Sequence, residues 1–480
     1  MTTTPASPPE DTAAVSPAAS STTGSGSAAS PLGDVVPFKD ATRAWFLISL
    51  QTFGGPAGQI AVMQHELVEK RRWIGQERFL HALSFCMVLP GPEAQQLAIY
   101  TGWLLNGTRG GLLAGGLFVL PGALAILALS AIYVTAGDTP FVSALFAGLG
   151  PAVIAIVVGA VHRVASRALN HRALTAIAVA SFLALTVLDI PFPVVIFAAG
   201  LLGWFLGRVL PQLGRPRSHG ASDGPPPLVS DEALHHALPT GRRTAVVLVT
   251  GIALWFVPVG AAALLRPSVG TSVLLDQSLF FSGAAVVTFG GAYAVLAYVA
   301  QQAVHVYGWL APGEMVRGLA LAETTPGPLI MVVQFVAFLG AYRNPGTLNP
   351  WVAGVIASLL TTWVTFVPCF LLVFLGAPYV ERLRRNTHLT AALSGITAAV
   401  VGVIANLATY FAIHTLFATT ASYGQGPLHL DLPALNSWRP AEFAITAAAL
   451  WLIANRKWSP LRTLGVCAVL GLATLLTSQT

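Results

Sequence analysis

Charged residues are what this sequence has least of. Only 9% of its 480 residues are charged, 55% are hydrophobic, and the mean hydropathy is +0.71. A soluble domain needs about 25% charged residues to cover its surface. We therefore expect lipid to be the solvent of this chain. The net charge of +6 lies in short loops, where it indicates orientation in a membrane rather than nucleic-acid binding.

Cysteine is also scarce, and its pattern excludes several chemistries. Cys86, Cys369 and Cys467 fall in three different apolar segments and form neither a Cys-x-x-Cys pair nor a metal-ligand spacing. We expect packing roles for them and no metal site. The chain contains no Walker A loop, so we expect no nucleotide cofactor. It also lacks a paired nucleophile and base at membrane depth, and we expect it not to be an enzyme.

What the sequence does contain is a series of long apolar runs. Roughly thirteen segments have the length of about 17–28 residues that crosses a bilayer. They predict an all-α polytopic membrane protein. The segments lie near 41–67, 79–106, 111–135, 142–162, 173–189, 191–209, 244–265, 276–304, 314–341, 352–377, 390–418, 440–455 and 461–478.

Two stretches differ from the apolar runs in composition. Residues 1–36 are rich in Ser, Thr, Ala and Pro, which predicts a disordered N-terminal tail. Residues 211–242 contain GRPRSHGASDGPPP and are typical of a flexible linker. An apolar segment without a counterpart, within 243–270, follows this linker and is expected to be a connecting transmembrane helix.

An ordered series of matches divides the chain into two copies of one unit. Phe53-Gly54-Gly55 recurs as Phe289-Gly290-Gly291, and Pro90-Gly91-Pro92 recurs as Pro326-Gly327-Pro328, both 236 residues later. After one small insertion the spacing becomes 247, for Pro121 with Pro368 and for Gly148 with Gly395. Such a series predicts a duplicated transporter architecture, with repeats at 37–210 and 271–480.

Loop charges predict that the two copies have opposite orientations. Lys70-Arg71-Arg72 and the cationic stretch 163–172 have counterparts near 305–313 and 410–419 that carry no Lys or Arg. Cationic loops stay in the cytoplasm. We therefore expect inverted halves, with the N-terminus and the linker in the cytoplasm and the C-terminus outside. The same rule favours re-entrant or deeply broken helices around each Pro-Gly-Pro triplet.

The two Pro-Gly-Pro triplets are candidates for an anion site. A helix that starts just after such a triplet exposes free N–H groups, and these and the helix dipole attract an anion. The alternative is that Pro and Gly only kink or pack membrane helices. The candidate substrate-binding residues are Gly54, Gly55, Gln59, Pro90, Gly91, Pro92, Gln95, Gln96, Gly290, Gly291, Thr324, Thr325, Pro326, Gly327 and Pro328.

Two acidic residues lie beside these triplets. Glu93 directly follows Pro92, and Glu323 precedes Pro326 by three residues. A carboxylate deep in a membrane is costly and is a functional candidate for that reason. One interpretation is proton-linked exchange, in which the carboxylate protonates as the anion binds. The other interpretation is that Glu93 is an N-terminal helix cap.

Three motifs carry a resemblance to a known family. They are FGGPAGQIAVMQHELVEKRRW at 53–73, LPGPEAQQLAIYTGWLLNGTRGG at 89–111, and LAETTPGPLIMVVQFVAFLGAYR at 321–343. From residue 41 to its end, the sequence resembles the long, two-domain bacterial members of the chromate ion transporter family. One departure is Ala292, where the first copy has Pro56.

The resemblance implies a secondary transporter of the bacterial inner membrane that exports chromate and confers chromate resistance. Its expected partners are chromate and the lipid bilayer, with sulfate and further copies of the chain as additional candidates and no nucleic acid. A carrier of sulfate or another oxyanion is the alternative within the family. A membrane protein without a transport function is a more distant one.

Overall fold

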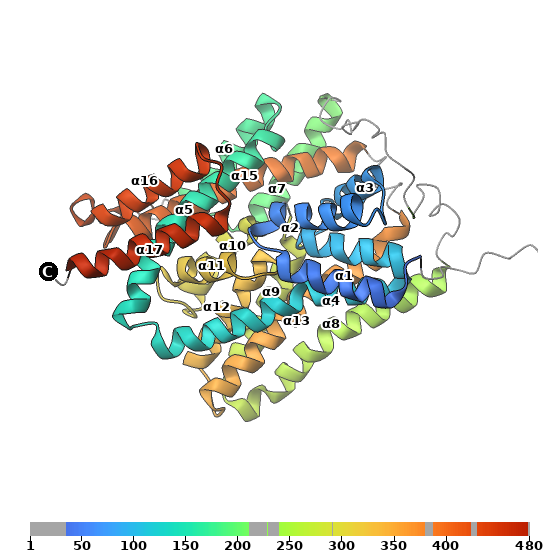
Figure 1. The fold of residues 1–480 in the computed structure, drawn as a ribbon, viewed down its shortest axis with the longest axis horizontal. Coiled ribbons are helices and arrows are strands. Elements are labelled where there is room, and N and C mark those ends of the chain that lie inside the picture. Colours follow the sequence, from blue (N-terminus) through green and yellow to red (C-terminus); the bar gives the residue numbers. More distant parts are fainter. Residues whose placement is uncertain are drawn as a thin grey trace, which may run out of the picture.

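The computed structural model describes residues 35–210, 228, 240–289, 291–379, 387–423 and 430–478. Residues 1–34 of the predicted tail, most of the predicted linker and Gly290 lie outside the described residues. The described part of the chain is helical, as the composition predicts (Figure 1).

The helices of the first half include four short ones and three long ones. The first two of the short helices flank the Phe-Gly-Gly motif, and the third ends just before Pro-Gly-Pro. The bounds are α1 (Phe38–Gln51), α2 (Gly55–Gln64) with a π-helical turn (His65–Lys70), α3 (Gln76–Cys86), α4 (Glu93–Ala136), α5 (Pro140–Ala168), α6 (Arg172–Thr186) and α7 (Phe192–Val209). The connecting helix α8 (Gly241–Val269) follows, at the position predicted for it.

The second half repeats this order of elements. Its helices are α9 (Val273–Val287), α10 (Ala292–Gln301) with a π-helical turn (Gln302–Val306), α11 (Glu314–Thr324), a 3₁₀ turn (Leu329–Met331), α12 (Val332–Arg343), α13 (Pro350–Gly376), α15 (Thr387–Leu416), α16 (Pro440–Ala454) and α17 (Pro460–Ser478). Between α15 and α16 lies a short antiparallel hairpin of β1 (Thr420–Tyr423) and β2 (Leu430–Pro433). The all-α prediction includes no strand there. The connection is long, and pairing its two arms satisfies backbone groups that a loop would leave open.

Among the described residues, six helices are long and apolar enough to cross a membrane: α4, α5, α7, α8, α13 and α15. Five shorter apolar helices accompany them. The element α4 consists of two helical arms that fold back on each other, so the predicted segments 79–106 and 111–135 stay separate here: a Cβ on Gly102 would lie 2.5 Å from the carbonyl oxygen of Gly110, and one on Gly111 would lie 3.0 Å from that of Ile99. Asn106 and Gly107 leave the helical conformation between the two arms, and the Asn106 amide donates to the Val36 carbonyl oxygen over 2.6 Å.

The helices are broken where the sequence predicts. The helix α3 ends at Cys86 and α4 starts at Glu93, so that Pro90-Gly91-Pro92 lies in the gap; α11 and the following 3₁₀ turn flank Pro326-Gly327-Pro328 in the same way. The helices α1 and α3 have 14 and 11 residues. At 1.5 Å per residue each is about 15–21 Å long, less than the hydrocarbon core of about 30 Å. Each is therefore too short to cross a bilayer alone.

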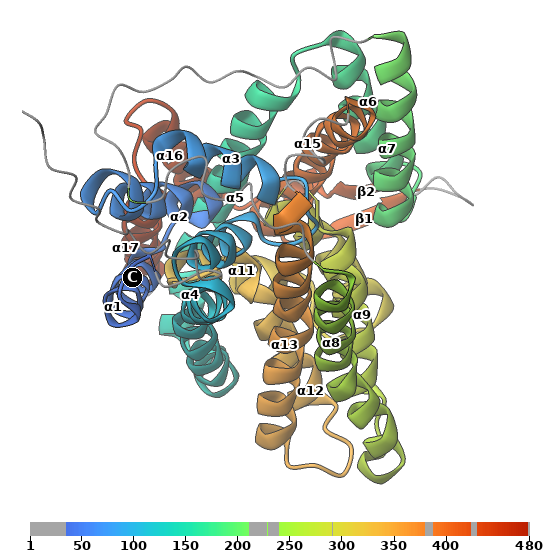
Figure 2. The same cartoon turned by 90° about the vertical axis from the view of Figure 1, so that its right-hand side faces the viewer.

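The two halves are intertwined rather than side by side. The helix α5 of the first half packs against α16 and α17 of the second, and α15 of the second half packs against α6 and α7 of the first (Figures 1 and 2). Glycines line both crossings. A Cβ on Gly148 of α5 would collide with the backbone of α17, and a Cβ on Gly203 of α7 would collide with the backbone of α15.

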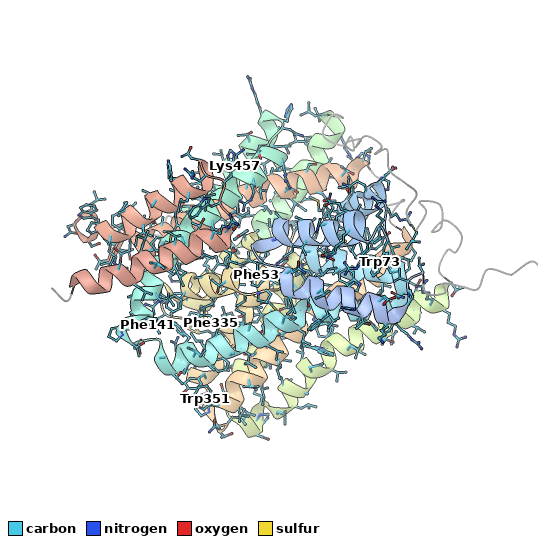
Figure 3. All side chains as sticks on the ribbon, viewed as in Figure 1. Phe53, Trp73, Phe141, Phe335, Trp351 and Lys457 are labelled. Carbon is cyan, nitrogen blue, oxygen red and sulfur yellow. The ribbon has the colours of Figure 1, made fainter. Side chains whose placement is uncertain are left out.

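The short helices α1–α3 lie at one side of the molecule (Figure 2), but the breaks are buried, since Thr52 and Thr288 are 0% exposed. In Figure 3, Phe53, at the break between α1 and α2, lies near the middle of the ribbon, whereas Trp351 and Lys457 lie toward opposite edges. The buried hydrophobic residues form two clusters. The smaller one is built on α1–α4 and includes Cys369 and Val373 of α13 from the other half. The core therefore joins the two halves at the level of the breaks.

Candidate functional site

Two backbone hydrogen bonds join the breaks of one half to those of the other. The Gly91 N–H donates to the Thr288 carbonyl oxygen over 2.7 Å, and the Gly327 N–H donates to the Thr52 carbonyl oxygen over 3.0 Å. Thr52 and Thr288 are counterparts 236 residues apart, and so are the two glycines. Each Pro-Gly-Pro triplet is thus seated on the Phe-Gly-Gly break of the opposite half. We call residues 52–55, 90–92, 288 and 326–328 the four-break junction.

Backbone geometry explains the central glycine of each triplet. Gly91 has φ +124° and Gly327 has φ +104°, a region that other residues rarely adopt. Neighbouring atoms also leave little space for a side chain at either glycine. A Cβ on Gly91 would lie 2.8 Å from both Cys369 Sγ and Gln96 Nε2, and one on Gly327 would lie 3.2 Å from the Cα of Gly122. Backbone and side chains therefore approach one another closely at both triplets.

The first triplet ends at the start of the first helical arm of α4. The helix α4 begins at Glu93, and the Gln96 N–H closes its first turn on the Pro92 carbonyl oxygen over 3.0 Å. The N–H groups of residues 93–95 have no acceptor within the helix, since the first N–H groups of an α-helix never do. The second triplet is followed by a 3₁₀ turn before α12. The two triplets therefore present different helix starts.

Several of the predicted site residues use their polar groups to hold the junction together. Gln59 of α2, buried, donates from Nε2 to the Gly327 carbonyl oxygen over 2.5 Å. Gln96 Nε2 donates to the Pro90 carbonyl oxygen over 2.6 Å. The hydroxyls of Thr324 and Thr325 donate back to carbonyl oxygens of α11. These donors position the irregular backbone, and each already donates one hydrogen bond to it.

Gln95 differs from these residues. It is fully buried, and within the described parts of the chain neither its Nε2 nor its Oε1 has a hydrogen-bond partner. The Oε1 of its neighbour Gln96 lacks a partner as well. Buried polar groups are nearly always paired, so an unpaired amide beside a helix start indicates room for a polar ligand.

The structure brings Glu323 to the junction together with a tyrosine that the sequence analysis does not single out. Tyr293 of α10 donates its hydroxyl to Glu323 Oε1 over 2.5 Å. Glu323 Oε2 is buried and, within the described ranges, has no partner. The Tyr293 hydroxyl also lies 3.7 Å from the position of a Cβ on Gly55. The sequence signal was Tyr293 itself, a polar residue where the first copy has Ala57.

Glu93 has a different environment. It is the first residue of α4 and is partly buried. In the portion of the chain that the structure describes, no side-chain hydrogen bond caps the start of α4. The interpretation of Glu93 as a cap therefore finds no hydrogen bond to support it.

The predicted site residues Gly54 and Gly291 stand at the N-terminal boundaries of α2 and α10, both with positive φ.

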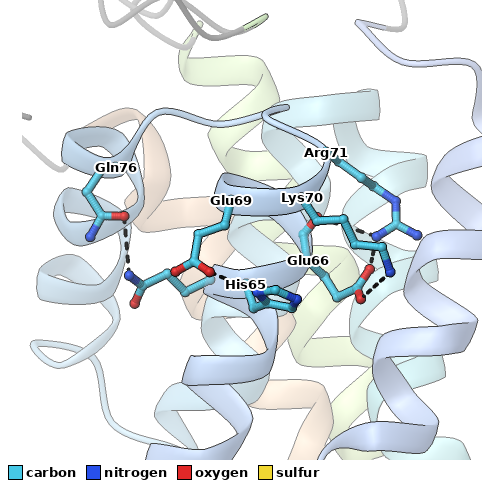
Figure 4. A network of polar contacts seen from close by, with 7 residues as sticks. His65, Glu66, Glu69, Lys70, Arg71 and Gln76 are labelled. Atoms are coloured by element: carbon cyan, nitrogen blue, oxygen red, sulfur yellow. Dashed lines mark hydrogen bonds and ion pairs between the residues drawn. The ribbon is translucent and has the colours of Figure 1, made fainter. Parts of the chain in front are cut away.

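Two ionic clusters lie outside the junction. At the end of α2, the buried Glu66 pairs with Lys70 over 2.9 Å and with Arg71, and His65 contacts Glu69 over 2.8 Å (Figure 4). This cluster holds the turn that carries the predicted cytoplasmic charges.

In the second cluster, Arg343 of α12 donates two hydrogen bonds of 2.7 Å to the Glu314 carboxylate of α11. The Tyr133 hydroxyl of α4 donates to the same carboxylate over 3.0 Å. Bidentate Arg–carboxylate pairs are strong and directional. The cluster therefore ties α4, α11 and α12 together away from the breaks.

Comparison with known proteins agrees with this architecture. A family model described as chromate transporter matches the chain twice, over residues 40–204 and 275–472. The chromate transport protein of Pseudomonas aeruginosa is 35% identical over 361 residues, which cover 74% of this chain and 76% of that protein. The chromate transport protein of Cupriavidus metallidurans is 29% identical over 353 residues, covering 73% and 77%. No solved structure matches the chain.

Proposed function

Because the chain belongs to the chromate transporter family, a family of multi-pass membrane transport proteins rather than enzymes, we propose that it exports chromate from the cytoplasm. One observation carries the assignment of the site. The hydrogen bonds from Gly91 to Thr288 and from Gly327 to Thr52 gather four backbone breaks from both halves into one buried junction. In a membrane, irregular backbone is tolerated only where protein buries it or where it lines a cavity for a ligand.

The chemistry of the junction suits a compact oxyanion. Chromate is a tetrahedral dianion close to sulfate in shape. The free N–H groups at the start of α4 and the positive end of its dipole attract negative charge. Gln95 adds an unpaired amide beside them. Substrate binding therefore centres on Pro90-Gly91-Pro92, while Gln59, Thr324 and Thr325 hold the surrounding backbone.

Transport of this kind is secondary, driven by ion gradients or by the membrane potential. Moving one charge through 100 mV is worth about 2.3 kcal/mol. A dianion leaving a cell whose interior is negative gains about twice that amount. The potential alone therefore favours export.

Glu323 and Glu93 are the carboxylates assigned to coupling. Glu323 accepts from Tyr293 through one oxygen and keeps the other unpaired in the buried junction. Protonation of that second oxygen removes a negative charge next to the anion and creates a donor in its place. Chromate binding and proton uptake thus favour each other at this residue.

The proposed topology follows from charge and helix length. Residues 37–210 and 271–480 form inverted repeats, joined by a cytoplasmic linker at 211–242 and by the crossing of α8. The segments 41–67 and 79–106, broken between α1 and α2 and between α3 and α4, are each re-entrant, which leaves Lys70-Arg71-Arg72 in the cytoplasm with the other cationic loops. The N-terminus then lies inside and the C-terminus outside the bacterial inner membrane.

Radiolabelled chromate uptake into everted vesicles tests the function. Vesicles with the protein are expected to take up chromate faster than matched vesicles without it, with sulfate as a weaker competitor. Strong uptake of sulfate but not of chromate would instead identify a sulfate carrier. Absence of flux for either anion would remove the transport assignment.

A further inference from the structure

Two buried hydroxyls of α13 belong to the same junction. Resting on the transport function proposed above, we infer that Thr361 and Thr365 bind the transported oxyanion and form the wall of its site opposite the start of α4. The site is then single: it lies at Pro90-Gly91-Pro92 and is completed by a helix of the second half.

Thr361 and Thr365 differ from the other hydroxyl-bearing residues of α13, because their buried hydroxyls have no hydrogen-bond partner in the part of the chain that the structure describes. Thr361 is 0% exposed and Thr365 is 2% exposed, and within the described residues neither Oγ1 has a hydrogen-bond partner. Threonine in a helix normally donates to the carbonyl oxygen one turn earlier. Thr362, next in sequence, does so, donating to Ser358 over 2.8 Å. A buried hydroxyl that forgoes this bond is oriented for another acceptor.

Helical periodicity and one contact place these hydroxyls on the face of α13 that meets the first triplet. Thr361, Thr365 and Cys369 follow at intervals of four residues and so share one face of α13. Cys369 Sγ lies 2.8 Å from the position of a Cβ on Gly91, and Gln96 Nε2 lies equally close to it from α4. The triplet is therefore enclosed between the face of α13 that carries the hydroxyls and the first turn of α4.

Further along the same face of α13, Ser358 donates to the carbonyl oxygen of Gln334 in α12 over 3.4 Å. The side chain of Gln334 is fully buried, and its Oε1 lacks a partner within the described ranges. Unsatisfied polar atoms thus continue along the boundary of α13 with α4 and α12. Native protein interiors contain few unpaired polar atoms, so a series of them along one boundary indicates a path for a polar ligand.

The second triplet, Pro326-Gly327-Pro328, has no hydroxyls at the positions equivalent to Thr361 and Thr365. Gly327 packs on Gly122, which stands 247 residues before Cys369 and is its counterpart. At the same spacing, Thr361 and Thr365 correspond to Ala114 and Phe118.

The residues that follow the two triplets also differ in polarity, being polar after the first and apolar after the second. Gln95 and Gln96 correspond, 236 residues later, to Met331 and Val332. The pseudo-symmetric fold therefore gives the two triplets similar backbone contacts, but only the first triplet has amides directly after it and hydroxyls at these positions of the facing helix. At the second triplet the corresponding positions are apolar, and the nearby Gln59, Thr324 and Thr325 already donate to backbone carbonyl oxygens.

The donors around the first triplet suit an anion that must also be released. Hydroxyls, amides and backbone N–H groups are neutral, and hydrogen bonds from several sides can cover the four oxygens of a tetrahedral anion. None of the residues argued here carries a fixed positive charge. Neutral donors hold the anion without a permanent ion pair that would have to be broken on release.

Valine substitutions test the assignment, because valine keeps the shape of threonine and removes the hydroxyl. For Thr361→Val and Thr365→Val, the KM for chromate in everted vesicles is expected to rise about tenfold, the effect of one lost hydrogen bond to a charged group. Thr361→Ser and Thr365→Ser should keep a KM near that of the wild type. Thr362→Val is the matched control, since its hydroxyl serves only its own helix, and its KM should not change.

Chromate-induced thermal stabilisation of the purified protein gives a second readout. Stabilisation should need higher chromate concentrations in Thr361→Val and Thr365→Val, but not in Thr362→Val. An unchanged KM and unchanged stabilisation in both variants would overturn the inference, and the hydroxyls would then be satisfied by water. An equal loss in Thr362→Val would show a packing effect and overturn it as well. Wild-type protein that neither transports nor is stabilised by chromate would instead refute the proposed function.

Discussion

At the scale of single residues, Glu323 and Glu93 lie beside equivalent triplets but in different surroundings. Glu323 is buried, bonded to Tyr293 through one oxygen and unpaired at the other. Glu93 stands partly buried at the start of α4. A buried carboxylate with one engaged oxygen has a defined position for its proton, and the partly buried one does not. We therefore assign the larger share of coupling to Glu323.

This assignment is tested by Glu323→Gln, which mimics the permanently protonated carboxyl. Chromate binding is expected to survive or tighten, since a competing negative charge is gone. Net flux is expected to fall and to lose its dependence on pH between about 6 and 8, because the carrier can no longer release its proton. The measurement is binding and vesicle flux in the same preparation.

Glu93→Gln is the comparison variant. It keeps an acceptor oxygen at the helix start, and its loss of stability should stay within the range of a lost cap, about 0.5–2 kcal/mol. If Glu323→Gln transports with the pH dependence of the wild type, Glu323 has no part in coupling. If Glu93→Gln alone shows retained binding with lost flux, the roles of the two carboxylates are reversed.

At the scale of elements, the breaks depend on glycines that pass close to side chains of the other half. Gly91→Ala places a Cβ against Cys369 Sγ and Gln96 Nε2 and forces a side chain into a positive φ. Backbone strain of this kind costs about 1–3 kcal/mol, and overpacking adds a similar amount. We expect chromate flux to be lost while the protein still inserts into the membrane.

Two further variants separate the effect of overpacking from the effect of backbone strain. Gly116→Ala lies in the second arm of α4, where a Cβ meets no atom within 4 Å, and should leave flux unchanged. Adding Cys369→Ala to Gly91→Ala should relieve the collision but not the strain, and so restore part of the flux. Normal chromate export by Gly91→Ala would show that the anion does not approach this helix start.

Much of this element-scale arrangement can be predicted from the sequence, and some of it cannot. The breaks follow from Pro-Gly-Pro, because proline removes a backbone donor and restricts the residue before it. The pairing of Gly91 with Thr288 does not follow, since spacing along a chain does not say which half supplies a partner. Thr361 and Thr365 could not be singled out either. Threonine is common in membrane helices, and only the missing hydrogen bonds distinguish these two.

At the scale of the whole molecule, orientation in the membrane depends on loop charge, which the arrangement of helices alone does not report. The helix α5 offers a direct measurement. It has 29 residues, about 43 Å at 1.5 Å per residue, which is enough to cross the membrane fully. Its two flanking loops differ in charge, and Asp138 and Asn170 in them are exposed. The positive-inside rule assigns Asn170 to the cytoplasm and Asp138 to the outside.

Single introduced cysteines test this orientation. A membrane-impermeant thiol reagent added to intact cells should label Asp138→Cys and leave Asn170→Cys unlabelled, and everted vesicles should reverse the result. The three native cysteines are buried, which keeps the background low. Labelling of Asn170→Cys in intact cells would overturn the proposed topology.

The intertwining of the halves has a consequence for biosynthesis. The helix α7 ends at Val209, and its partner α15 begins at Thr387, about 180 residues later. At a synthesis rate of about 5–20 residues per second, α6 and α7 wait roughly 10–40 seconds in the membrane for that partner. The helix α5 waits longer still, because α16 and α17 are the last to leave the ribosome. Neither half can complete its packing as it emerges, so assembly of the carrier is a late event that begins only when translation is nearly over.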